Sequence, residues 1–292
     1  MTVSLESAAP VIAADSHTHG LALGATWLLV VPLAVAAVAY VSAATAERSR
    51  GRRSWSRWRD ASWLAGLAVV ASTLTGPLAA AAHGDPAAHM VAHLLAGMLA
   101  PLLLVAALPV TLALRSLDVV PARRLSRVLA SPPLRVVSHP VVAATSTVGS
   151  LWLLYATPLA GAMRDTPLVH ELVIVHVVAA GVLFTASIVP VDPSPHRSSF
   201  RLRLVVLVAA IAAHSVLAKH VFAVAPVGWT AAEAERAGLV MYYGGDALEF
   251  VLLVAFFARW YRAAGRGLRR AEPREYDPAY VAALGRSRRR LS

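Results

Sequence analysis

Long, continuous apolar blocks dominate the hydrophobic pattern of the chain, in place of the alternating or one-face patterns of soluble strands and helices. Polar, arginine-rich or proline-containing segments separate the blocks. The blocks lie at 21–44, 61–82, 88–114, 138–160, 167–190, 202–224 and 239–261. A bilayer core about 30 Å thick needs about 20 mostly apolar residues per helix. The pattern therefore predicts an all-α integral membrane bundle of seven transmembrane helices.

Two of the predicted helices contain breaking residues, namely Gly76-Pro77 in the second block and Pro158 in the fourth. The first residues of the chain have no basic segment ahead of the apolar block, which favours a retained helix over a cleaved signal peptide. We expect three regions along the chain. They are an extracytoplasmic segment at 1–20, a membrane domain at 21–262 and a basic cytoplasmic tail at 263–292.

The basic residues are sorted by loop, and this sorting predicts the orientation of the bundle. All but three of the 27 Lys and Arg residues lie between the first and second blocks, between the third and fourth, between the fifth and sixth, or after the seventh. The exceptions are Arg164, Lys219 and Arg236. Positive residues remain in the cytoplasm, so we expect the N-terminus outside and the C-terminus inside. The net charge of +11 then faces anionic lipid of the bilayer, and nucleic acid is not an expected partner.

The histidines collect on the opposite side from the arginines. Only His139 and His196 of the eleven histidines fall on the predicted cytoplasmic side. The other nine fall in outer loops or in the outer halves of helices: His17, His19, His83, His89, His93, His170, His176, His214 and His220. The chain has no cysteine, so a disulfide framework and thiolate metal sites are excluded.

Five ionisable residues on four predicted helices share one depth in the membrane. With a rise of about 1.5 Å per residue, they lie roughly 10–15 Å below the outer surface or near mid-depth. They are His93, His176, His214, Asp246 and Glu249. Such residues are costly in a bilayer and normally face an interior site. His89 and His93 share a helix face, as do Asp246 and Glu249.

Each of these residues also has an ordinary structural explanation. A single intramembrane histidine often makes only a helix–helix hydrogen bond, and this applies to His176 and His214. The acidic pair could form a salt bridge with Lys219. Met90 and Met98 are more typical of packing than of metal ligation. The joint pattern is harder to explain in this way than any single residue.

The chemistry of the cluster leaves three functions open. Imidazole and thioether donors without cysteine suit copper on the extracytoplasmic side, and carboxylates can orient ligating imidazoles. Two histidines on facing helices could instead hold a non-covalent b-type haem. A copper or proton transporter is the third alternative. GxSxG, HExxH and P-loop motifs are absent, so we expect a protein that is not an enzyme.

Four segments resemble the CtaG-like family of caa-type cytochrome c oxidase assembly factors, which are multi-pass membrane proteins. The first is AHMVAHLLAGMLAPLLLVAALPVTLALR at 88–115. The second and third are HPVVAATSTVGSLWLLYATPL at 139–159 and HELVIVHVVAAGVLFTASIVPVDPSP at 170–195. The fourth is GGDALEFVLLVAFFARWYR at 244–262.

The resemblance implies an assembly factor in a bacterial plasma membrane that binds copper and delivers it at the extracytoplasmic side. Its expected partners are cytochrome c oxidase subunits or an extracytoplasmic copper chaperone. Six histidines carry over as candidate ligands, namely His83, His89, His93, His170, His176 and His214. Met90 is an additional candidate ligand. Asp246 and Glu249 are expected to orient the imidazoles or to attract the cation.

Overall fold

The computed structural model describes residues 9–51, 55–157, 159, 166–193 and 196–271. These residues form helices and contain no strand, which confirms the predicted all-α class. The chain divides into two units, of which the first ends at Leu252 and the second begins at Leu253. All cavities and polar clusters described below belong to the first unit.

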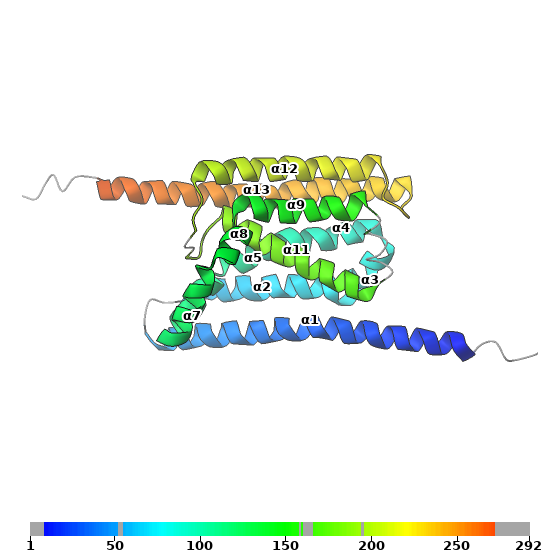
Figure 1. The fold of residues 1–292 in the computed structure, drawn as a ribbon, viewed down its shortest axis with the longest axis horizontal. Helices are drawn as coiled ribbons and strands as arrows, with labels where there is room; N and C mark the ends of the chain where they lie inside the picture. The colour runs from blue at the N-terminus through cyan, green and yellow to red at the C-terminus, as the bar shows by residue number, and fades with distance from the viewer. Residues whose placement is uncertain (1–8, 52–54, 158, 160–165, 194–195, 272–292) are drawn as a thin grey trace, which may run out of the picture. The chain divides into compact units, whose positions relative to one another are not determined.

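The order of the helices along the chain is shown in Figure 1. The first half of the chain contains α1 (Ala9–Ser49), α2 (Arg57–Leu74), α3 (Gly76–Gly84), α4 (Pro86–Leu94), the π-helix η1 (Leu95–Leu99), α5 (Ala100–Ala106) and α6 (Pro109–Ser116). The second half contains α7 (Val119–Leu129), α8 (Pro132–Val137), α9 (Pro140–Ala156), α11 (Pro167–Ile188), α12 (Phe200–Ala223) and α13 (Ala231–Ala271).

Five helical stretches are long and apolar enough to cross a membrane. They are Leu29–Ser49, Pro86–Ser116, Leu168–Ile188, Phe200–Ala223 and Ala231–Gly265. The α2–α3 pair meets the same test if its 43° bend is counted as part of one span. The shorter helix α9 is also apolar. Each predicted apolar block therefore corresponds to helical structure, and five or six of the helices qualify as spans by length and composition.

Several boundaries differ from the sequence prediction. Helix α1 begins at Ala9, inside the segment predicted to precede the first span. Helix α13 begins at Ala231 and continues to Ala271, beyond both ends of the predicted block 239–261. The expected break at Gly76-Pro77 is the bend between α2 and α3, where Gly76 has a φ of +82°. The expected break at Pro158 lies outside the described residues.

Prolines start many of these helices. Helices α3, α4, α5, α6, α8, α9 and α11 all carry proline in the first turn. The missing N–H of proline is harmless there, because the first turn has no intrahelical acceptor for it. Most of these prolines therefore begin a helix at no cost in backbone hydrogen bonds, whereas Pro32 lies inside α1.

Charged residues tie the helices together at one end of the bundle, which we call the arginine end. The guanidinium of Arg115 lies 3.3 Å from the carboxylate of Glu47, which is 1% exposed. Arg48 pairs with Asp60 at 2.6 Å. The hydroxyl of Tyr40 donates to the carbonyl of Ala107 at 2.7 Å. These contacts join α1 to α2 and to the α5–α6 segment.

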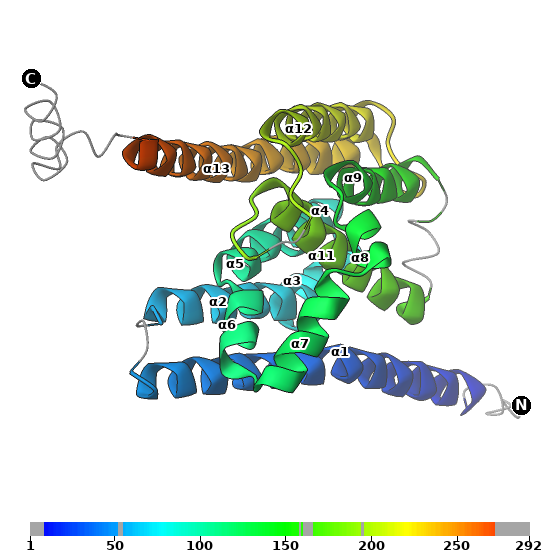
Figure 2. The same cartoon turned by 60° about the vertical axis from the view of Figure 1, so that its left-hand side comes forward.

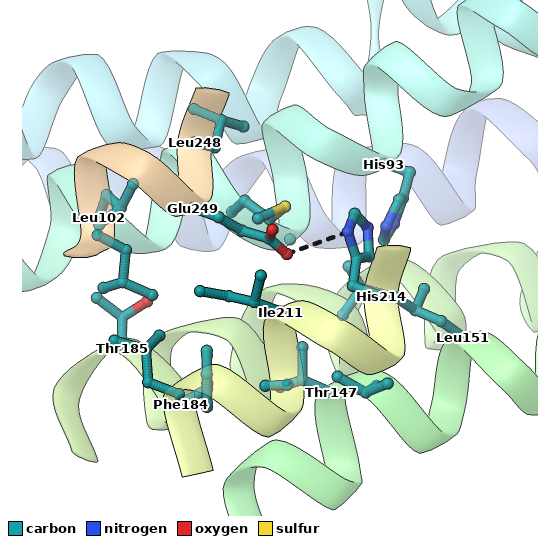
Figure 3. Close-up of a pocket in the computed structure, with 17 residues that line it drawn as sticks. His93, Leu102, Thr147, Leu151, Phe184, Thr185, Ile211, His214, Leu248 and Glu249 are labelled. Atoms are coloured by element: carbon teal, nitrogen blue, oxygen red, sulfur yellow. Dashed lines mark ion pairs between the residues drawn. The ribbon is translucent and has the colours of Figure 1, made fainter. Parts of the chain in front are cut away.

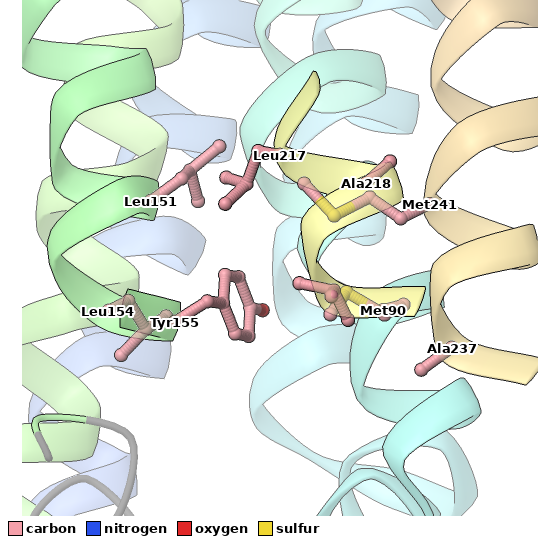
Figure 4. Close-up of a cluster of buried hydrophobic side chains, with 9 residues drawn as sticks. Met90, Leu151, Leu154, Tyr155, Leu217, Ala218, Ala237 and Met241 are labelled. Atoms are coloured by element: carbon pink, nitrogen blue, oxygen red, sulfur yellow. The ribbon is translucent and has the colours of Figure 1, made fainter. Parts of the chain in front are cut away.

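The opposite end, which we call the histidine end, contains the α3–α4 junction, the start of α11 and the loop between α12 and α13 (Figures 1 and 2). Towards this end a cluster of buried apolar side chains joins α4, α9, α12 and α13 (Figure 4). Its members are Met90, Leu151, Leu154, Tyr155, Leu217, Ala218, Val221, Ala237 and Met241. The cluster fixes the positions of the helices that carry the candidate site.

Candidate metal site

A buried histidine–carboxylate pair joins α12 to α13. The Nδ1 atom of His214 lies 3.1 Å from an Oε1 atom of Glu249 (Figure 3). The two residues are 5% and 6% exposed. With Glu249 as a carboxylate, which only accepts hydrogen bonds, Nδ1 of His214 is the donor of this pair. In the neutral ring the lone pair is then on Nε2, a nitrogen through which a metal can bind.

His93, on α4, lines the same cavity as His214 and Glu249. The cavity has a volume of about 50 Å³ and is otherwise walled mostly by apolar side chains from α5, α9, α11 and α12. One water needs roughly 10–15 Å³ by this measure, so there is room for an ion with a few atoms around it. The cavity is therefore small and mostly apolar, with two imidazoles and a carboxylate in its wall.

Four polar atoms around this cavity are buried and have no hydrogen-bond partner in the described structure. They are Nε2 of His93, Nε2 of His214, Oε2 of Glu249 and Oγ1 of Thr147. Each such atom costs about 1–3 kcal/mol relative to a satisfied one. Four such atoms around one cavity make it the candidate binding site of the first unit. The donor set of two imidazole nitrogens suits a transition-metal ion.

A π-turn and several glycines allow the helices to pack closely around His93 and His214. The π-helix η1 begins two residues after His93. A π-turn is wider than an α-helical turn, and such turns are frequent at functional sites. Gly97 in η1 lies against α11 so closely that a Cβ on Gly181 would overlap the Gly97 carbonyl oxygen. On α13, a Cβ on Gly245 would overlap the imidazole of His214 and lie 2.9 Å from its Nδ1. Glycine at 245 therefore leaves room for the ring of His214.

A second histidine cluster lies at the histidine end. The imidazoles of His83 and His170 stack with centroids 5.2 Å apart. His89 meets the ring of Tyr155 edge-on at 6.3 Å. These residues line a cavity of about 100 Å³ whose wall also contains Asp85. Five of the six predicted histidine ligands are thus at one of two cavities.

The acidic residues of this second cavity have structural partners. Asp85 accepts hydrogen bonds from the N–H groups of Ala87 and Ala88 and so caps α4. Glu233 accepts from the N–H and the hydroxyl of Thr230 at the start of α13. The two carboxylates give the cavity negative charge while they stabilise the helix ends.

Three predicted site residues lie away from both cavities. His176 is on an exposed face of α11, and Asp246 is exposed on α13. Met90 is fully buried in the apolar cluster of Figure 4 and lines neither cavity. Lys219, the competing partner for the acidic pair, lies 5.4 Å from the ring centroid of Tyr242, while Glu249 pairs with His214.

Two further residues of the inner cavity are not among the candidates that the sequence predicts. Met98, which the sequence favours as a packing residue, lines this cavity. Thr147 carried no distinguishing pattern, because a threonine in an apolar helix usually bonds its own backbone. The described residues contain no group of three or more His, Asp or Glu side chains arranged to hold a metal ion.

Residues 38–263 match the family described as cytochrome c oxidase caa3 assembly factor. Uncharacterized proteins of Mycobacterium bovis and Mycobacterium tuberculosis are each 34% identical over 188 residues, which cover 62% of this chain and 28% of theirs. An uncharacterized protein of Mycobacterium leprae is 27% identical over 268 residues, 85% of this chain and 40% of its own length. The chain thus spans less than half of the curated relatives it matches. No solved structure matches it significantly.

Proposed function

Because this chain belongs to the cytochrome c oxidase caa3 assembly factor family, we propose that it supplies copper to a haem–copper oxidase during assembly. The observation that carries this proposal is the pair of buried, unpartnered Nε2 atoms of His93 and His214 on one cavity. The role is one of handling a cargo and is not catalytic. The recipient is an oxidase subunit, and the donor is an extracytoplasmic copper carrier.

The donor set favours copper as the cargo. Imidazole nitrogens bind several transition metals, and a thioether adds a preference for Cu(I). The cavity offers the imidazoles of His93 and His214 together with the thioether of Met98. Glu249 fixes the ring of His214 in the orientation that presents Nε2, as carboxylates do behind many metal-ligating histidines. With few ligands the ion stays exchangeable, which a delivery protein requires.

We further propose that the chain crosses a bacterial plasma membrane seven times, with its N-terminus outside. Five helices, or six with the bent α2–α3 pair, qualify as spans, and α9 would be the seventh. Helix α9 has 17 residues, the lower limit of the usual length for a span. The arginine end would face the cytoplasm according to the positive-inside rule. The histidine end and both histidine-lined cavities would then be accessible from outside the cell.

The volume of the inner cavity favours copper over haem. About 50 Å³ accommodates an ion but not a haem macrocycle between His93 and His214 unless the helices move apart. A visible spectrum of the purified protein checks this choice. A Soret band with split α and β bands would replace the copper proposal with a b-type haem protein.

Metal analysis of purified protein tests the central proposal. Protein loaded with Cu(I) without oxygen and then freed of excess metal should retain copper, and a His93→Gln/His214→Gln variant should lose most of it. The matched control is His139→Gln, an exposed histidine at the start of α9 that lines neither histidine cavity. Equal copper in the double variant and the wild type would contradict the proposal.

The same variants test the cellular role. A host that lacks its own copy of this protein should assemble oxidase with reduced copper content and activity. Wild-type protein and His139→Gln should restore both, whereas His93→Gln/His214→Gln should restore neither although it is present in the membrane. Full restoration by the double variant would separate assembly from copper binding at this cavity.

A further inference from the structure

Three cavities follow one another from the histidine end to the inner site, and each shares histidines with the next. The cavity that contains His83 and the inner cavity are bridged by an intermediate cavity of about 40 Å³. The intermediate cavity shares His89, His170, Tyr155 and Ala82 with the first. It shares His93 with the inner cavity. Adjacent cavities therefore adjoin the same imidazole side chains.

The spacing of the histidines suits stepwise transfer. His89 and His93 are one helical turn apart on α4, about 6 Å along the helix axis. His89 borders the first and intermediate cavities, and His93 borders the intermediate and inner ones. The remaining walls of the intermediate cavity are largely apolar side chains, including Leu154, Val173 and Ile174. A bare cation there would be costly, so the imidazoles are the stabilising contacts along this route.

His83 and His214, at the two ends of the route, can each offer Nε2 to an ion. Nδ1 of His83 lies 2.7 Å from the carbonyl oxygen of Ala79. A carbonyl only accepts hydrogen bonds, so Nδ1 of His83 donates, and in the neutral ring Nε2 keeps its lone pair. His214 presents Nε2 in the same way, through Glu249. The hydroxyl of Tyr155, on the wall of the first two cavities, is buried and has no partner in the described structure.

We propose that these cavities form a histidine relay that takes Cu(I) from an entry site at His83 and His170, past His89, to the inner site at His93 and His214. The relay rests on the function proposed above and adds the route and the order of binding. Each step exchanges one imidazole for the next on the same ion. Copper remains Cu(I), and neutral imidazole nitrogens release no proton when they bind it.

The wall between the first two cavities offers a way to block the route without removing a ligand. Ala82 lines both of these cavities, so Ala82→Phe would fill their junction. Ala80 lies on the same helix but is exposed and lines none of the three cavities, so Ala80→Phe is the matched control. The probe is Cu(I) supplied as a weak chromogenic chelate without oxygen, and the loss of the chelate colour gives the rate of loading.

We expect Ala82→Phe to load at least about tenfold more slowly than the wild type, because the ion would lack its stabilising contacts at the junction. The final copper content should equal that of the wild type, and Ala80→Phe should load normally. If Ala82→Phe loses final copper, the site itself has been disturbed, and a His83→Gln/His170→Gln variant then decides. Slow loading to normal content supports the relay, and loading at the wild-type rate overturns it.

The outcomes separate this proposal from the one it rests on. If wild-type protein retains no more copper than His93→Gln/His214→Gln, the inner site and the proposed function both fail. If the wild type retains copper but Ala82→Phe and His83→Gln/His170→Gln load as fast as it does, only the relay fails. Copper would then reach His93 and His214 by another path.

Discussion

Glu249 determines which nitrogen of His214 faces the inner cavity. Its carboxylate accepts from Nδ1, and the opposite nitrogen is left buried without a partner. Asp246, three residues earlier, belongs to the same predicted acidic pair but is exposed. The sequence spacing treats the two carboxylates alike, whereas in the structure only Glu249 pairs with His214.

Replacement of Glu249 should therefore weaken copper binding without abolishing it. In Glu249→Gln the charge that favours the Nδ1–H tautomer of His214 is lost, and affinity should fall about 10- to 100-fold. Asp246→Asn, its matched control, should bind as the wild type does. Competition with a Cu(I) chelator measures both affinities. The reverse order of effects would show that Asp246 is the orienting residue.

Gly245 is a second residue that affects the position of the His214 ring, because it has no Cβ. An added Cβ would overlap the ring of His214, so Gly245→Ala should displace that ring and lower copper affinity about tenfold or more. Overpacking should also destabilise the fold by about 1–3 kcal/mol. Gly149→Ala is the control, since its nearest neighbour would be 3.8 Å away. Unchanged copper affinity in Gly245→Ala would show that the ring position is not critical.

At the scale of elements, a carboxylate between helices fixes the arginine end. Asp192, just after α11, accepts hydrogen bonds from the N–H groups of Val110 and Thr111 at the start of α6. The α5–α6 connection turns sharply through Leu108, which has a φ of 58°, a left-handed conformation that is unfavourable for a side-chain-bearing residue. The cap by Asp192 holds α6 in place after this turn.

Loss of this cap should destabilise the protein measurably. We expect Asp192→Ala to lower the free energy of unfolding by about 1–2 kcal/mol, as for other helix caps. Asp118 stands at the start of α7 without a side-chain cap bond, so Asp118→Ala should change stability little. Denaturant titration in detergent compares the two variants. Similar losses would mean that the Asp192 bonds add little to stability.

The helical stretch that carries His93 is interrupted by a π-turn. The stretch Pro86–Ser116 reads as one apolar block, but it is built from α4, η1, α5 and α6. Because the π-turn of η1 contains more residues than an α-helical turn, the side chains after it point in different directions from those of a regular helix. His93, before this turn, and Met98, inside it, consequently both line the inner cavity.

At the scale of the whole molecule, the orientation can be tested because the chain has no native cysteine. With seven spans, an impermeant maleimide should label Ser4→Cys in intact cells and Ser292→Cys only after lysis. Val224→Cys, exposed near the histidine end, should react from outside, and Arg123→Cys, exposed on α7, only from inside. Labelling of both termini from one side would contradict an odd number of spans.

The sequence by itself determined the helical class, the apolar blocks, the sorting of arginine from histidine and the family resemblance. These features follow from local composition, because the cost of placing polar groups in lipid acts on each segment separately. Depth was also accessible, since each residue advances about 1.5 Å along a helix. His93, His214 and Glu249 share the expected depth, and in the structure they line one cavity.

Only the tertiary structure decided which residues of equal depth face one another. His176 and Asp246 share the predicted depth but lie on exposed faces, whereas Met98 and Thr147 line the inner cavity. The rotation of each helix about its own axis depends on packing contacts with its neighbours, such as Gly97 with Gly181 and Gly245 with His214. These contacts join residues far apart in the chain, so no local pattern encodes them.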